Sequence, residues 1–334
     1  MPTATLYDLA DRFYDLAPWE VLEEVDLIRV VHPVTGESGY ISVMGAGGEH
    51  CCLALYLGEA ALRRFNLMKE DDPFDPAVPE LDSLGLVLET RQLQAAFGLR
   101  AELRKDELAE IKKLGRKYRG DNWPMFRSFK AGYAPGPLDE AETLWLTTAL
   151  EQFLAVFPTL ESDGSQSTRV QEDNVEVLTR RFEKGAWQTT WSELDCYSHE
   201  WATPEPSELL LEKIRRQERL VDIDCHYQVL PAPVGGPQSA VFPYLAISVE
   251  RESGFIFGMD MLSVETQSHK ELVASVPDVF LRQWDKSGIR PASIRVSTIT
   301  TYSMLEIAAA ELNTPLRRAD RLPNIERVLR ELPL

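Results

Sequence analysis

The sequence contains no long hydrophobic run. About 20 consecutive apolar residues are needed to span the core of a bilayer, and no stretch of the 334 residues approaches that length. The first segment, MPTATLYDLADRFYDLAPWE, carries acids where a secretory signal has a basic and then an apolar stretch. We therefore expect a soluble, cytoplasmic protein that does not bind membranes.

Cysteine is scarce, and its four copies are poorly spaced for zinc. Cys51 and Cys52 are adjacent within an apolar segment, whereas Cys196 and Cys225 stand alone. Without a CxxC pair, neither a zinc knuckle nor a thioredoxin-like motif is available. Cys196 and His199 have a ligand-like spacing, but a metal site needs more ligands, and the tryptophans nearby favour aromatic packing. We expect reduced thiols, mostly in the core.

Positive charge is in deficit. The chain has 35 Lys and Arg against 53 Asp and Glu, a net charge of −18. Because a protein that binds a nucleic-acid backbone must neutralise phosphates, this balance makes nucleic acid an improbable partner.

One segment, residues 100–130, departs from this balance, since ten Lys and Arg side chains there outnumber five acids and alternate with aromatic residues. Such a mixture can bind single-stranded nucleic acid through charge and stacking. Two other interpretations are favoured over this one. The segment is either a solvated helix over about 106–117 followed by a packed loop at 123–129, or it docks on an acidic surface of the same protein.

The common nucleotide and hydrolase motifs are also missing. There is no GxGxxG, no P-loop lysine and no GxSxG. The glycine-rich stretch Gly45–His50 could cradle a phosphate only if a helix followed it. A strand pattern follows instead, so we predict a hairpin turn there.

What the chain has in quantity is length and apolar patterning. At 334 residues it exceeds the usual size of one core, which predicts two domains. Residues 1–160 indicate an α+β domain with an antiparallel meander. Its expected elements are a helix at 6–17, strands at 26–32, 39–45, 51–57 and 84–89, a helix from 59, a loop at 70–82, and a helix at 146–157 that Pro158 ends.

The polar stretch 161–174 (ESDGSQSTRVQEDN) is the expected linker. A second domain, 175–334, is predicted after it as α/β. Its expected elements are a strand pair at 175–182 and 187–194, a helix at 207–218, strands at 220–230, 244–250 and 255–262, a helix at 268–285 that Pro277 kinks or splits, a strand at 293–297, a helix at 302–312, a strand at 316–319 and a helix from 323.

The first strand of that set alternates between two kinds of residue. Asp222, Asp224 and His226 fall on one face of the strand, opposite an apolar face. Two interpretations stand side by side. The face is either solvated or a metal or acid–base cluster, and covering it with a helix would favour the second, because unpaired buried carboxylates are costly.

The order of three strands followed by helix, strand, helix, strand, helix resembles the ribonuclease H-like fold of integrase and transposase cores. YLAISVERESGFIFGMDM is similar to the second and third strands of such cores, PASIRVST to the fourth, and the segment ending LNTPLRRAD to the fifth. The resemblance covers about residues 218–334 and implies a mixed sheet.

It also implies a carboxylate cluster that holds two divalent metal ions. Asp222 or Asp224 matches the first-strand acid of that family. Glu326 on the last helix could supply the third acid, with Glu306 and Glu311 as weaker candidates. The second acid is missing, because Ser297 stands at the end of the fourth strand.

The whole chain also resembles bacterial two-domain proteins of unknown function. The N-terminal likeness lies in YISVMGAGGEHCCLALYLG, and the C-terminal likeness in RPASIRVST and RADRLPNIERVLREL. This resemblance supports the division into two domains and implies no chemistry.

Three functional hypotheses follow. The leading one is a non-catalytic binding or scaffold protein that acts through contacts with a protein partner and needs no cofactor. The second is a nuclease-like enzyme that holds Mg²⁺ or Mn²⁺ on Asp222 and Asp224. The third is a small-ligand binder in a cleft between domains.

Overall fold

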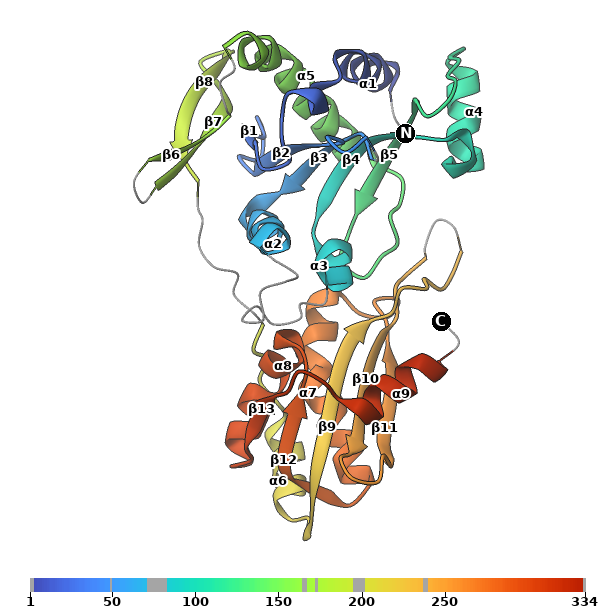
Figure 1. The fold of residues 1–334 in the computed structure, drawn as a ribbon, viewed down its shortest axis with the longest axis vertical. Helices are drawn as coiled ribbons and strands as arrows, with labels where there is room; N and C mark the ends of the chain where they lie inside the picture. The colour runs from blue at the N-terminus through green and yellow to red at the C-terminus, as the bar shows by residue number, and fades with distance from the viewer. Residues whose placement is uncertain are drawn as a thin grey trace. The chain divides into compact units, whose positions relative to one another are not determined.

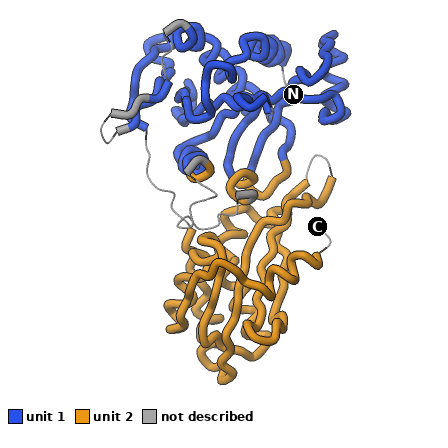
Figure 2. The backbone as a smooth tube through the Cα atoms, in the orientation of Figure 1, with its two compact units in different colours: residues 1–66, 90–130, 135–198 blue, residues 67–89, 131–134, 199–334 orange. Residues whose placement is uncertain are grey.

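The computed structural model of the chain describes residues 3–48, 50–70, 83–163, 167–171, 174–194, 202–236 and 240–332. The chain divides into two compact units, shown in separate colours in Figure 2. Unit 1 comprises Met1–Asn66, Thr90–Lys130 and Pro135–Ser198. Unit 2 comprises Leu67–Glu89, Ala131–Ala134 and His199–Leu334.

Unit 1 is built on one mixed sheet, visible in the blue-to-green part of Figure 1. Its strands follow the order β5-β4-β3-β2-β1-β7-β6, and β8 pairs with β7. Neighbours from β5 to β1 are antiparallel, whereas β1 and β7 are parallel. The strands are β1 (Ile28–Val31), β2 (Ser38–Met44), β3 (Cys52–Leu57), β4 (Gln92–Gly98), β5 (Trp123–Phe129), β6 (Thr168–Gln171), β7 (Asn174–Glu183) and β8 (Ala186–Glu193).

The predicted meander of three strands is confirmed, with β2 central to it. The α-helices of this unit are α1 (Ala4–Leu16), α2 (Gly58–Glu70), α4 (Lys105–Lys113) and α5 (Glu140–Asp163). Helices α1 and α5 pack together against the sheet, and their apolar faces share one core with it. In that core Phe13 and Phe153 are fully buried and in ring contact.

Three predictions for this part of the chain are wrong. Residues 83–89 form a helix, α3 (Ser83–Glu89), where we expected a strand. Residues 123–129 form strand β5 and not a loop. Helix α5 continues through Pro158 and does not end there, because Phe157 and Leu160 on either side of the proline are both buried. The loop expected at 70–82 lies almost entirely outside the described residues.

The strand pair expected at 175–194 is present as β7 and β8, but it joins the first sheet. Residues Ile28–Val30 of β1 pair in parallel with Leu178–Arg180 of β7. The structure therefore differs from the boundary that we set at 161–174, since the first sheet continues past it. Strand patterning could not reveal this, because alternation shows which face of a strand is buried and not which sheet it joins.

Unit 2 is built on a five-stranded sheet of order β11-β10-β9-β12-β13. Strands β9 to β11 are antiparallel, and β12 and β13 run parallel to β9. The elements are α3, α6 (Glu208–Arg215), β9 (Arg219–Val229), β10 (Tyr244–Glu250), β11 (Ile256–Leu262), α7 (His269–Lys286), β12 (Ile289–Val296), α8 (Ile299–Glu311), β13 (Leu316–Arg318) and α9 (Pro323–Glu331). The predicted element order from β9 onward is confirmed. Helix α7 runs as a single helix through Pro277.

The two faces of this sheet are covered differently. The face that carries Ile223 and Cys225 packs against α7 and α8 in a large apolar cluster. Within the described residues, the other face packs against α9 and the segment before it, in a small cluster centred on Leu245, Ile247 and Ile325. The predicted alternation along β9 is therefore confirmed, and Asp222, Asp224 and His226 lie on the face with the lighter cover.

Candidate functional site

The candidate site lies on β9, where the acids face the α9 side of the sheet. The side chain of Asp224 is 1% exposed, and that of Asp222 is 52% exposed. His226 is buried as well. The interpretation as a solvated strand face is therefore wrong for Asp224 and His226 and holds only for Asp222. Because a buried carboxylate must be paired, the partners of Asp224 decide what this site can do.

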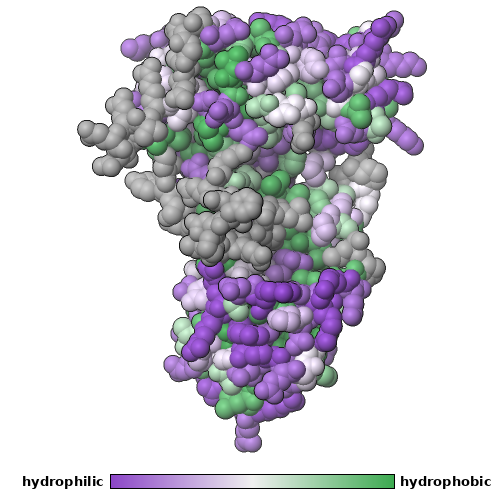
Figure 3. Space-filling model, viewed as in Figure 1, coloured by the Kyte–Doolittle hydropathy of each residue, from purple (hydrophilic) through white to green (hydrophobic). Residues whose placement is uncertain are grey.

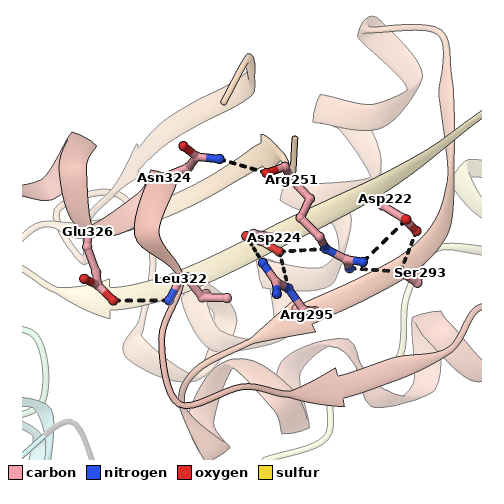
Figure 4. Close-up of polar contacts among 8 residues, drawn as sticks. All are labelled: Asp222, Asp224, Arg251, Ser293, Arg295, Leu322, Asn324 and Glu326. Atoms are coloured by element: carbon pink, nitrogen blue, oxygen red, sulfur yellow. Dashed lines mark hydrogen bonds and ion pairs between the residues drawn. The ribbon is translucent and has the colours of Figure 1, made fainter. Parts of the chain in front are cut away.

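Two arginines surround Asp224 (Figure 4). Arg295 donates from Nε to Oδ1 and from Nη2 to Oδ2, each at 2.8 Å, which is a two-point guanidinium–carboxylate contact. Arg251 adds Nε at 3.4 Å from Oδ1. Hydrogen bonding to Asp224 raises the pKa of Arg295 above its ordinary value. The Arg295 guanidinium thus stays charged at any physiological pH.

Strand register and one turn bring these groups together. The parallel pairing of β9 with β12 sets Arg295 directly beside Asp224. Arg251 follows the last residue of β10, and its backbone carbonyl accepts a hydrogen bond from Asn324 Nδ2 of α9 at 2.9 Å. The turn is therefore tied to the helix that covers this face.

Arg251 also joins the second acid to the network. Its Nη1 lies 3.5 Å from Asp222 Oδ2, and its Nη2 donates to Ser293 Oγ at 2.9 Å. The Ser293 hydroxyl donates to Asp222 Oδ1 at 2.6 Å. We call these five residues, Asp222, Asp224, Arg251, Ser293 and Arg295, the arginine–aspartate network. It balances two carboxylates with two guanidinium groups.

The third expected acid lies apart from the network. Glu326 accepts hydrogen bonds from Arg321 and from the backbone N–H of Leu322, at the start of α9. The Arg321 contact lowers the pKa of Glu326. The weaker candidates are further away in the fold, because Glu306 and Glu311 lie on α8, which covers the opposite face. Glu326 therefore caps a helix and does not complete an acidic triad.

Two residues beyond Asp224 on β9, the side chain of His226 contacts Ser297, which directly follows β12. His226 Nε2 is 3.0 Å from Gln228 Oε1, and its Nδ1 is 3.4 Å from Ser297 Oγ. Since an amide oxygen only accepts hydrogen bonds, Nε2 donates to Gln228 in this contact, and in the neutral imidazole Nδ1 then accepts from the serine hydroxyl. At the end of β12, where a metal-dependent nuclease needs an acid, the chain thus has a hydroxyl held by an imidazole.

The arrangement is unfavourable for a divalent metal ion. Among the residues that the structure describes, no group of three or more His, Cys, Asp and Glu side chains is placed to hold one. A cation approaching Asp224 would meet Arg251 and Arg295, and like charges at such distances repel strongly when partly shielded from water. What the network does provide is a rigid, charge-balanced connection between β9, β12 and the β10–β11 turn.

Comparison with family models matches nearly the whole chain. Residues 4–180 match a domain of unknown function, DUF7309, and residues 210–333 match a second, DUF6930. The chain belongs to the DUF7309 family. A search of curated proteins found no match. The DUF6930 match covers β9 to β13 and contains the entire arginine–aspartate network.

The basic segment at 100–130 lies inside the DUF7309 match, and several of its cations pair with acids of unit 1. Arg116 binds Asp8 and Asp11, at 2.5 and 2.6 Å. Arg127 pairs with Glu107, and Lys130 Nζ is 3.0 Å from a carboxylate oxygen of Glu142 on α5. Of the aromatic residues, Phe126 is buried in the core and Trp123 packs against it. These contacts support docking within the protein over nucleic-acid binding.

The remaining sequence candidates are the glycine-rich stretch and the Cys196–His199 pair. Gly45–Gly48 form the turn between β2 and β3, with the Gly48 N–H donating to the Gly45 carbonyl at 2.8 Å, so the predicted hairpin in the DUF7309 region is confirmed. Cys196 and His199 lie outside the described residues. No helix within the described ranges is long and apolar enough to cross a membrane.

Sequence reasoning found the acids and missed their partners. Arg295 could have been found, because placing the two strands in parallel with their apolar residues aligned sets it beside Asp224. Arg251 gives no comparable signal, since its side chain reaches the site from a turn whose direction the sequence does not specify.

Proposed function

We propose that this chain is a non-catalytic binding protein that acts through contacts with protein partners. The observation that carries the proposal is the pairing of Asp224 with two arginines. In a nuclease the same position would need an unpaired carboxylate next to a metal ion. Here it bears two guanidinium groups, and a hydroxyl replaces the second acid.

The strand order of unit 2 supports a relation to the ribonuclease H-like fold. Three antiparallel strands are followed by two parallel ones on the far side of the first strand. We infer a relative of that fold in which ion pairing has replaced metal binding, so that the sheet serves as a rigid platform. A cytoplasmic location fits this proposal and is part of it.

Metal titration tests the proposal directly. Wild type and Asp224→Asn are melted with and without millimolar MnCl₂ or MgCl₂. An ion bound only to the folded state at 100 times its dissociation constant would add about 2.7 kcal/mol and raise Tm by a few degrees. We expect no rise in either protein. A rise in wild type that Asp224→Asn abolishes would establish the metal-dependent alternative.

A gain-of-binding variant tests the physical reason. Replacing Arg251 and Arg295 with glutamine removes both positive charges, and adding Ser297→Asp supplies the missing acid. We expect this triple variant, and not the matched Arg251→Gln/Arg295→Gln control, to show a Tm increase that depends on Mn²⁺. If neither binds Mn²⁺ although both remain folded by circular dichroism, then the arginines are not what prevents metal binding.

A further inference from the structure

The two edges of the five-stranded sheet are protected very differently. Strand β13 forms one edge and has three residues, two of them arginines. Strand β11 forms the other edge and has seven residues with a single charge, Asp260. Natural sheets normally shield an edge by shortening it or by charging it, because its outward N–H and C=O groups can pair with another strand. Edge β13 has both protections, whereas β11 is long and carries a single charge.

The β11 edge also carries a concentration of exposed apolar side chains. Phe255 is 61% exposed, Ile256 39%, Met259 47% and Met261 55%. Met259 and Met261 pair with Ile247 and Leu245 of β10. They therefore lie on the α9 side of the sheet and continue the apolar cluster of that face out to its rim. We call these four residues the β11 apolar edge.

The single charge of β11 is exposed and lies on the opposite face of the sheet from the exposed methionines. Asp260 faces the other side of the sheet, where Gln283 of α7 donates to its Oδ2 at 2.8 Å. The hydroxyl of Ser287 donates a hydrogen bond to the backbone carbonyl of Phe257 at 3.1 Å, near the start of the strand. The segment from Gly258 to Leu262 lies beyond that contact, and an edge strand directs alternate backbone groups away from its one neighbour.

One exposed charge at each end of β11 has the opposite sign to the other, and exposed Glu252 lies in the turn before the strand. Exposed Arg327 lies against Gly254, just before the strand, and exposed Glu265 follows the strand. Two antiparallel copies of β11 would place the Arg327 end of each beside the Glu265 end of the other. A contact between like surfaces related by a two-fold axis needs this self-complementarity.

We propose that the β11 apolar edge is a homodimer interface, in which β11 pairs antiparallel with β11 of a second copy about a two-fold axis near Met259. The two five-stranded sheets become one continuous sheet, and the exposed methionines pack across the axis. This surface is distinct from the arginine–aspartate network, so the proposal and the metal titration succeed or fail independently.

Solution mass provides the first test. Sedimentation equilibrium of the full chain should give twice the 37.8 kDa monomer mass at micromolar concentration. Met259→Lys/Met261→Lys should give the monomer mass, because two added cations from each copy would meet at the axis. Leu209→Lys is the matched control, since this residue of α6 is equally apolar and exposed and lies outside β11, and it should remain dimeric.

Charge reversal and cross-linking test the antiparallel arrangement. Arg327→Glu should weaken the dimer at least several-fold in Kd, and adding Glu265→Arg should restore it. Met259→Cys should form a disulfide-linked dimer under mild oxidation, whereas Leu209→Cys and wild type should not.

Three outcomes would overturn the proposal. The first is a wild type that is still monomeric at about 100 µM, which would leave this edge to a different partner. The second is a dimer that Met259→Lys/Met261→Lys does not disrupt. The third is a dimer in which Met259→Cys never cross-links. Circular dichroism of every variant separates loss of the dimer from loss of the fold.

Discussion

The two faces of the five-stranded sheet are held together by different interactions. On the face under α7 and α8, large side chains such as Phe280 and Trp284 are fully buried. On the face under α9, a small apolar cluster lies beside the arginine–aspartate network. Burial of apolar area supplies most of the driving force for folding, so the first face stabilises the unit. The second face uses buried charge, which adds little stability and fixes geometry.

The largest expected effect tests the apolar face. Phe280→Ala removes a fully buried ring from α7 and should lower the free energy of unfolding by about 3–5 kcal/mol. Urea unfolding followed by circular dichroism measures this loss. A loss below that for Asp224→Ala would reverse the comparison between the two faces.

The next effect tests the network. Asp224→Ala leaves Arg251 and Arg295 without their shared carboxylate, and both are partly exposed to water. We expect a loss of about 2–3 kcal/mol, because hydrogen bonds to charged groups contribute this much. Asp222→Ala is the matched control. Because Asp222 is half exposed, its replacement should lower the free energy of unfolding by less than about 1 kcal/mol. Equal losses would show that burial of Asp224 does not matter.

A smaller effect tests the cover of the second face. Ile325→Ala removes the one α9 side chain that is completely buried against β10. We expect the free energy of unfolding to fall by about 2 kcal/mol, at the low end for such truncations. A helix at the rim of a sheet can move to fill part of the cavity. Hydrogen exchange should show faster opening of α9 with β12 unchanged. Uniform acceleration across the sheet would contradict separate stability of the two faces.

The smallest effect depends on pH. Contact with Arg321 lowers the pKa of Glu326 below its ordinary value of 4.5. A lowered pKa gives stability that is present above the unfolded-state pKa and is lost as pH falls through the folded-state value. The Tm difference between wild type and Glu326→Gln should therefore be small at pH 7 and vanish as the pH falls through the lowered pKa of Glu326. A difference that persists in acid would show that the carboxylate charge does not stabilise α9.

Sequence reasoning succeeded where periodicity was long and failed where the residues were ambiguous. The alternation in β9 and the stripe of α7 extend over many residues, and both elements were predicted. The run Leu84–Leu88 is short and apolar throughout, so its pattern does not distinguish a strand from a helix. Strand β4 was missed because Gln92–Gly98 mixes glutamine, alanine and glycine, which are weak strand formers.

One proline misled the prediction, and another is tolerated because of its position. Pro124 lies in β5, which is an edge strand, where a missing N–H costs no ladder bond. Pro158 argued for the end of a helix, but Phe157 and Leu160 are both buried, and their packing offsets the lost hydrogen bond. In both cases tertiary position decided the outcome. For the site, the acids on one face of β9 were predictable and their arginine partners depended on register and a turn.

Unit 2 draws on three separate stretches of the chain, and this has a consequence during synthesis. Leu88 of α3 belongs to the same buried cluster as Leu272, and the Gly132 carbonyl accepts from the Phe242 N–H. A ribosome that adds about 5–20 residues per second makes α3 and Gly132 on the order of ten seconds before β9 and β10 exist. For that interval these segments have no native partner. Nascent chains of this protein must therefore keep an apolar helix from mispairing until the last third of the chain has emerged.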